Sequence, residues 1–390
     1  PGPHPMTPPL LLKGFQVEMY TGRPDGTVVG CAAEVAAELS GFVTEPDNRN
    51  LEYFTRPDAD YRRQLALLLE PRRRLRRWLE PRGLTLLPGS TMSLGDSERF
   101  VRSDASNPYH TFIESTYGTR VVTASVHLNL GMDAMEALFA GLRLLRCEAS
   151  LLLALSASSP FLDGHPTGVH SQRWLQFPLT PPQVPLFLDH AHYVRWVDEQ
   201  LQAGAMRNIR HLWTSVRPNG EDRPHRLNRL EIRICDLIGD PLLLLAITAF
   251  AELRLQLLLR DPPGQDPLAA SPLSPQELAT LADSNDRAAS RASLDAELLH
   301  WRTGEPIRAR DWISLELEQM ASLAAELGLS RTLAPLQRIL GEGNEAIRWL
   351  RAFTDGEGIR AILTRETAAL TTRDRELEAR LTTDTPHALG

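Results

Sequence analysis

Apolar and polar residues alternate with a period of two in four segments of the chain, the pattern of strands that bury one face. The other face of each strand carries mostly polar side chains instead. These faces hold Gln16, Glu18 and Tyr20 in Gly14–Tyr20; Asn48, Asn50 and Glu52 in Asn48–Phe54; Thr123, Ser125, His127 and Asn129 in Thr123–Leu130; and Arg229, Glu231, Arg233 and Cys235 in Asn228–Cys235. The pattern predicts an antiparallel sheet with one polar face.

Helical segments lie between these strands. The clearest is Asp133–Leu155, and Pro241–Leu259 is also predicted as a helix. A third helix, Asp60–Glu80, is expected to be interrupted by Pro71, because proline lacks the backbone N–H of the helical hydrogen bond. The long polar stretch Pro88–Tyr117 shows no clear periodicity, and stretches of this kind are usually either functional or disordered.

A change of composition divides the chain near residue 261. The segment Asp261–Ser274 reads as a linker, and everything after it is predicted to be helical. Ser274, Pro275 and Glu277 have the spacing of a capping box at a helix start. The expected organisation is a disordered tail or cloning scar over residues 1–9, a catalytic α+β domain over 10–260, a linker over 261–274 and a helical C-terminal region over 275–390.

The overall charge argues against nucleic-acid binding. The chain of 390 residues has 42 Lys and Arg against 49 Asp and Glu, which gives a net charge of −7. Its three cysteines are too few for a disulfide framework and predict a reducing, cytoplasmic location. The longest apolar runs, Ala149–Ala157 and Pro241–Ala251, are shorter than the roughly 20 residues that cross a membrane, so no membrane association is expected.

The four polar faces together suggest chemistry. For any single strand, a polar face that meets water is the ordinary interpretation. If the four faces converge, however, they form a pocket of carboxylates, one imidazole and a guanidinium. Such a pocket suits Mg²⁺ or Mn²⁺, and Arg233 there could stabilise a phosphoryl group in transfer. The motifs of P-loop, Rossmann and zinc-protease sites are absent from the sequence.

A set of phrases in chain order resembles the cyanobacterial type of glutamate–cysteine ligase, a group within the ATP-dependent carboxylate–amine ligases. The phrases are LLKGFQVEMYTG, EPDNRNLEY, PGSTMSLGD, NPYHTFIESTYGT, VVTASVHLNLG, ALSASSPFLDG, TGVHSQRW, RHLWTSVRPNG and LNRLEIRICDL. They run from about Leu10 to Leu245, and looser matches follow in Asp283–Trp301 and Ala309–Ile313. The ordered set is specific, although any one phrase alone is weak.

The resemblance implies a fold like the catalytic half of glutamine synthetase, a curved antiparallel sheet that forms a funnel with helices outside. It implies ATP and Mg²⁺, with Mn²⁺ as an alternative, and L-glutamate and L-cysteine as the amino acids. The implied reaction activates the γ-carboxylate of glutamate as an acyl phosphate, which the cysteine amine then displaces. This reaction is the first step of glutathione biosynthesis, and the enzyme would be a monomer or homodimer.

The family's site residues carry over by position. The metal ligands would be Gln16, Glu18, Glu45, Glu52, His127 and Glu231. Arg233 and Glu231 would be catalytic, with Arg233 and Glu52 at the ATP, and Arg173, Asn129 and Thr123 would hold substrate. The polar stretch Pro88–Tyr117 would supply loops over the mouth of the funnel.

One position departs from the family pattern, in which the first strand reads G-x-E-x-E. Here it reads Gly14-Phe15-Gln16-Val17-Glu18, so a neutral amide replaces the first acid and metal affinity should fall. Three explanations stay open: an engineered change that traps nucleotide, a natural variant with altered metal use, or an inactive relative. The intact motif around Gln16 favours the first two. A ligase that uses another amine, and a non-catalytic nucleotide- or amino-acid-binding homologue, are the alternative functions.

Overall fold

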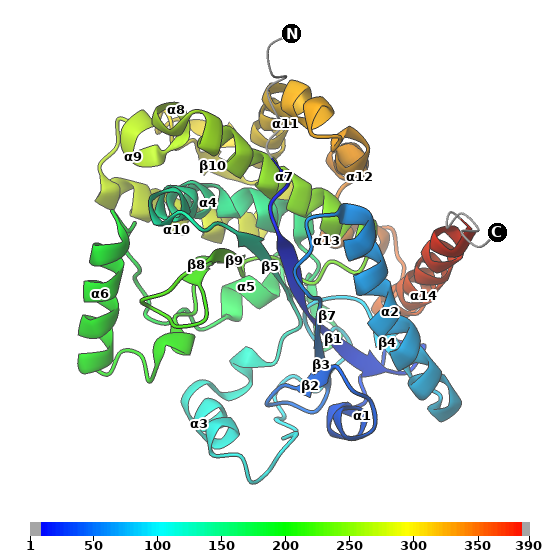
Figure 1. Cartoon of the computed structure of the whole chain (residues 1–390). Coiled ribbons are helices and arrows are strands. Elements are labelled where there is room, and N and C mark those ends of the chain that lie inside the picture. The colour runs from blue at the N-terminus through cyan, green and yellow to red at the C-terminus, as the bar shows by residue number, and fades with distance from the viewer. Residues whose placement is uncertain (1–8, 384–390) are drawn as a thin grey trace, which may run out of the picture.

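The computed structural model describes residues 9–383, and its centre is a seven-stranded sheet (Figure 1). The strand order is β2-β3-β1-β5-β9-β8, β4 pairs with the far end of β1, and every pairing is antiparallel. The strands are β1 (Lys13–Gly22), β2 (Phe42–Thr44), β3 (Asn50–Phe54), β4 (Thr85–Leu87), β5 (Val126–Gly131), β8 (Val216–Asn219) and β9 (Arg229–Ile232). The predicted α+β class with an antiparallel sheet is confirmed.

Helices cover the apolar face of this sheet. Helix α4 packs on β8 and β9, and α7 and α10 pack on α4 (Figure 1). The helices are α1 (Ala32–Glu38), α2 (Tyr61–Leu79), α3 (Pro108–Tyr117), α4 (Met135–Ser156), α5 (Gln172–Gln176), α6 (His190–Gln202), α7 (Pro241–Arg260), α8 (Pro262–Gln265), α9 (Pro267–Ala270), α10 (Pro275–Ala292), α11 (Ala309–Glu326), α12 (Ser330–Glu342), α13 (Glu345–Thr354) and α14 (Ile359–Thr383).

Two predicted helices have nearly the expected bounds but differ from the prediction in another respect. Helix α2 runs through Pro71 without a break, so the predicted interruption is wrong; the buried Leu68, Leu75 and Leu79 hold both halves against the core. Helix α7 has 20 residues and is long and apolar enough to cross a membrane, so its apolar stretch was underestimated. Of its most apolar window, 83% is buried inside the protein, as in the central helix of a core.

The chain on either side of residues 261–274 shares one apolar core. A single cluster of buried side chains joins Leu128 on β5 and Leu253 on α7 to Leu281 on α10 and Leu336 on α12. The expected linker contains the short helices α8 and α9, and the predicted capping box of Ser274 and Glu277 is present. A hairpin of β10 (Glu297–Leu299) and β11 (Pro306–Arg308) interrupts the predicted run of helices after α10.

Candidate active site

The register of the sheet brings the polar faces together. Glu18 on β1 lies opposite Glu52 on β3, and Gln16 lies opposite His127 on β5. Alternate residues of a strand point to the same side, so the pairing of β5 with β9 brings Glu231 beside this group as well. The four polar faces therefore do converge, because the central strands β3, β1, β5 and β9 are neighbours in this order.

Three carboxylates form one wall of the site. Glu18, Glu45 and Glu52 each offer an oxygen, and the three oxygens lie within 4.8 Å of one another. Burial and the negative charge of Glu18 raise the pKa of Glu45 to about 8. Burial, with Glu45 and Glu18 beside it, raises the pKa of Glu52 well above its ordinary value, and burial also raises the pKa of Glu18. A hard divalent cation fits this donor set, because it would offset the mutual repulsion of the carboxylates.

His127 is hydrogen-bonded to the side-chain amide of Gln16. Its Nδ1 lies 2.8 Å from Oε1 of Gln16, and its Nε2 lies 3.3 Å from Oγ of Ser125. Burial and the positive charge of Arg233 lower the pKa of His127 to about 3. Ser125 also donates to Oε2 of Glu18 at 3.0 Å, so it connects the imidazole to the carboxylate wall.

Glu231 is surrounded by nitrogen donors. Its Oε2 accepts from Nε of Arg217 at 2.7 Å and from Nδ2 of Asn219 at 3.0 Å, and its Oε1 accepts from Nη1 of Arg233 at 3.0 Å. Nδ1 of His127 lies 3.4 Å from Oε1. Burial alone would raise the pKa of Glu231, but Arg217 and Arg233 together lower it well below its ordinary value. Glu231 is thus an ionised anchor for two arginines.

A cavity of about 210 Å³ lies between these groups. Of the predicted site residues, the cavity is lined by Gln16, Glu18, Glu45, Glu52, Thr123, His127, Arg173 and Arg233. Glu231 is not among its lining residues and holds Arg233 from one side. The guanidinium of Arg173 donates to the carbonyl oxygens of Arg233 and Ile234, so Arg173 also supports the strand end that carries Arg233.

A second cavity, of about 600 Å³, adjoins the first at Gln16, which lines both. The predicted substrate residue Asn129 lies here and not in the first cavity. Asn219, Asn228 and Arg229 contribute the rest of the polar lining on the β8–β9 side. Much of the remaining wall is apolar and comes from the segment before β1 and from Phe54.

Sequence reasoning missed several residues of the first cavity. Helix α3, within the stretch expected to supply loops, contributes Tyr109 and Ile113, and Phe177 and Trp213 extend this apolar wall. Arg217 was also missed, although it faces Glu231 across the β8–β9 pairing. The segment V-R-P-N could have indicated it, because Arg217 lies two residues before Asn219 and alternate residues of a strand share a face.

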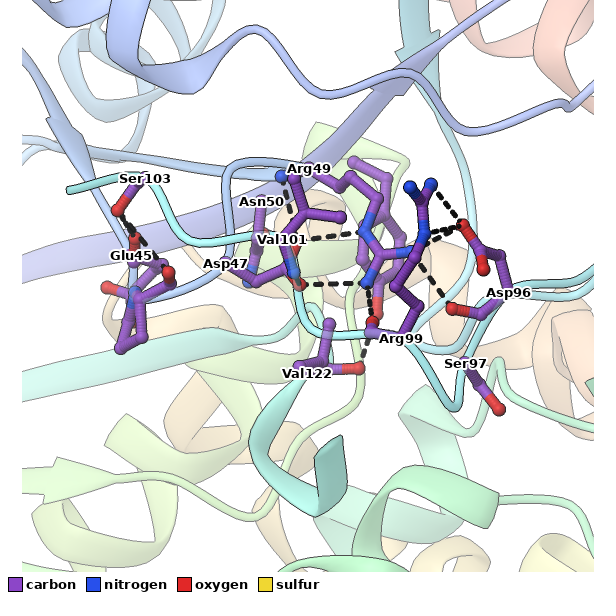
Figure 2. Close-up of polar contacts among 12 residues, drawn as sticks. Glu45, Asp47, Arg49, Asn50, Asp96, Ser97, Arg99, Val101, Ser103 and Val122 are labelled. Atoms are coloured by element: carbon purple, nitrogen blue, oxygen red, sulfur yellow. Dashed lines mark hydrogen bonds and ion pairs between the residues drawn. The ribbon is translucent and has the colours of Figure 1, made fainter. Parts of the chain in front are cut away.

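An arginine clamp fixes the loop that carries Asp47, another residue of the cavity wall (Figure 2). Arg49 is 3% exposed and binds the Asp47 carboxylate through Nε at 2.9 Å and Nη2 at 2.8 Å. It also donates to the carbonyl oxygens of Asp96 and Arg99, and the N–H of Val101 donates to Asp47 at 2.9 Å. The clamp therefore ties the β2–β3 connection to the polar stretch above the site.

Arg49→Ala should lower the free energy of unfolding by about 3–5 kcal/mol, because it leaves the buried Asp47 carboxylate without its partner. Arg63→Ala is the control; it removes an arginine that is 62% exposed and pairs with Asp58, and should change the free energy of unfolding far less, because water screens an exposed ion pair. Urea denaturation measures both. A cost for Arg49→Ala no larger than that of the control would show that the clamp does not hold the loop.

The raised pKa values predict an unusual pH dependence in the absence of divalent cations. An unfolded glutamate titrates near pH 4.5 and folded Glu45 near 8, so between these values the folded state binds more protons. The free energy of unfolding should therefore fall as the pH rises through this window. Mg²⁺ should reduce the fall, and so should Glu45→Gln. Thermal unfolding between pH 5 and 8, with and without Mg²⁺, measures this; identical slopes in all samples would contradict it.

The comparisons with known proteins identify the family of the chain. The model of glutamate-cysteine ligase family 2 (GCS2) matches residues 13–365, so the chain belongs to this family. A relative in Sorangium cellulosum named "Putative glutamate--cysteine ligase 2" is 31% identical over 245 residues, 61% of either chain. One in Rubrobacter xylanophilus named "Putative glutamate--cysteine ligase 2-2" is 26% identical over 90% of this chain and 88% of its own.

Two solved structures share the fold. A glutamate–cysteine ligase of Francisella tularensis, in complex with AMP, has a TM-score of 0.68 at 12% identity, over 97% of this chain and 94% of its own. A bifunctional glutathione synthetase of Pasteurella multocida has a TM-score of 0.69 at 14% identity, over 95% of this chain and 52% of its own. At these identities the likeness concerns the fold alone.

Proposed function

We propose that this protein is an ATP-dependent ligase that joins the γ-carboxylate of L-glutamate to the amine of L-cysteine, the first step of glutathione biosynthesis. One observation carries the proposal. A single cavity places the three carboxylates Glu18, Glu45 and Glu52 on one wall, with Arg173 and Arg233 also lining it. Carboxylates for a cation and arginine for phosphate are what phosphoryl transfer to a carboxylate requires. Membership of the ligase family supports the same reaction.

The proposed reaction has two steps. An oxygen of the γ-carboxylate attacks the γ-phosphorus of ATP, ADP leaves, and γ-glutamyl phosphate forms. The amine then attacks the acyl carbon, phosphate leaves with the C–O bond electrons, and the nitrogen loses a proton. Activation is needed because a carboxylate oxygen is a poor leaving group.

The residues have distinct roles in this scheme. Glu18, Glu45 and Glu52 would hold Mg²⁺, or Mn²⁺ in its place, which offsets the charge of the phosphates when bound. Arg233 would contact the transferred phosphoryl group, and Glu231 fixes its guanidinium. Thr123 lines the smaller cavity, where we place glutamate and the amine, and Arg173 supports that wall. The larger cavity, with Asn129, would take the nucleotide, so that the phosphates reach the junction at Gln16.

A ligase of the same family with a different amine is the second candidate. The wall of Tyr109, Ile113, Phe177 and Trp213 is apolar and would also accept an amine with a larger apolar group. A third candidate is a catalytically impaired nucleotide-binding homologue, because Gln16 is neutral where the family has an acid. A cytoplasmic location and a monomeric or dimeric state stay predictions.

ADP release with ATP, Mg²⁺ and L-glutamate tests the proposal, with L-cysteine or a panel of other amines added and Gln16→Glu measured in parallel. We expect cysteine-dependent ADP release and γ-glutamylcysteine by mass spectrometry, with higher activity in Gln16→Glu. Turnover only with another amine would support the ligase activity and reject L-cysteine as its substrate. No turnover by either protein with any amine would favour the binding homologue.

A further inference from the structure

The residues expected to bind metal fall into two groups of opposite charge. On one side, Glu18, Glu45 and Glu52 carry up to three negative charges. Glu52 is 8% exposed and lines the cavity, and among residues 9–383 no arginine, lysine or N–H group donates to its carboxylate. A buried carboxylate that faces a cavity without a positive partner either keeps its proton or takes a cation from outside the chain. This group is suited to a cation.

The other group is already balanced by the protein itself. Both oxygens of Glu231 are taken by donors from Arg217, Asn219 and Arg233. Glu231 and its two arginines together carry a net charge of about +1. A divalent cation brought to Glu231 would have to displace an arginine and would be repelled by the one that remained.

Gln16 adds no ligand to this second group. Its one carbonyl oxygen accepts from Nδ1 of His127 at 2.8 Å, and its other terminal atom is an NH₂ group that cannot bind a cation. A glutamate at this position would instead offer two charged oxygens next to Glu18 and the imidazole. The neutral side chain thus leaves the Glu231 side of the site without a free carboxylate.

We propose that this chain binds one divalent cation, at Glu18, Glu45 and Glu52, and that Arg217 and Arg233 supply the positive charge that a second cation would supply beside Gln16. The role of the arginines toward phosphate rests on the proposed function, but the number of cations does not. Arg217, which donates to Oε2 of Glu231, is then the partner that keeps Glu231 from acting as a metal ligand.

Counting bound Mn²⁺ by the EPR signal of the free ion tests this on the full chain, with MnCl₂ as the only addition. The native chain should bind one Mn²⁺, and Gln16→Glu should bind two. Glu52→Gln should weaken the single site at least tenfold. Gln202→Glu adds the same charge at an exposed position of α6 and should still bind one. Circular dichroism checks that each variant is folded.

Two results would overturn the inference: two or more Mn²⁺ bound to the native chain with similar affinity, or a count of one in Gln16→Glu. Mn²⁺ counting and the ADP-release assay of the proposed function can fail independently. If the Mn²⁺ counts are as expected but no amine gives ADP release, the ligase is rejected and the single-cation site is kept. Cysteine-dependent ligation by a native chain that binds two Mn²⁺ would support the ligase and reject the single-cation site.

Discussion

Glu52→Ala should lower the rate of ADP release roughly 1,000-fold while the protein stays folded. Glu52 lies opposite Glu18 across the β1–β3 pairing and belongs to the three-carboxylate group, so its loss removes one third of the charge that would hold the cation. The fold should survive, because the variant relieves repulsion between buried carboxylates whose pKa values are already raised. Steady-state kinetics with saturating ATP and L-glutamate measure the effect.

Glu34→Ala is the matched control for this prediction. Glu34 is an exposed residue of α1 outside both cavities, and its replacement should leave the rate unchanged. If Glu52→Ala turned over at a rate close to that of the native chain, Glu52 could not be part of the cation site, and the assignment of the carboxylate wall would fail.

Glu231→Gln should lower ADP release by roughly 100- to 1,000-fold, through a different cause. The amide keeps the shape of the side chain but no longer balances Arg217 and Arg233, whose guanidinium groups would repel each other without the carboxylate between them. Arg233 would then leave the position from which it reaches the cavity. We expect kcat to fall more than the apparent affinity for glutamate, because Glu231 does not line the cavity.

Glu221→Gln makes the same substitution at an exposed position and should behave like the native chain. A folded Glu231→Gln protein with normal kcat would show that the position of Arg233 does not matter for the chemistry. A Glu231→Gln protein that is inactive but also binds Mn²⁺ less tightly would instead support the sequence-based prediction that Glu231 is a metal ligand.

The strands that carry the site were predictable because each has a clear period of two. The polar faces of β1, β3, β5 and β9 were identified from alternation alone, and the register then places Gln16 opposite His127 and Glu18 opposite Glu52. Helix α4 and the capping box of α10 were predicted for similar local reasons. Local pattern suffices where one face is buried, since a shift by one residue would expose the apolar side chains.

The remaining parts depend on contacts between distant segments. The clamp of Arg49 joins residues about 50 positions apart, and no local spacing indicates it. Whether Glu231 binds a cation or two arginines depends on β8, because Arg217 on β8 lies opposite Glu231. The position of β8 follows only from its pairing with β9. Helix α2 continues through Pro71 because tertiary packing outweighs the lost hydrogen bond, a balance that composition does not reveal.

The transfer of oxygen from carboxylate to phosphate tests the central claim most directly. The protein is incubated with ATP, Mg²⁺ and L-glutamate labelled with ¹⁸O in the γ-carboxylate, and hydroxylamine serves as a small amine that any acceptor pocket would admit. If an acyl phosphate forms, one ¹⁸O appears in each inorganic phosphate released, together with γ-glutamyl hydroxamate. Release of unlabelled phosphate would mean that water and not the carboxylate attacks ATP, and the ligase account would be wrong.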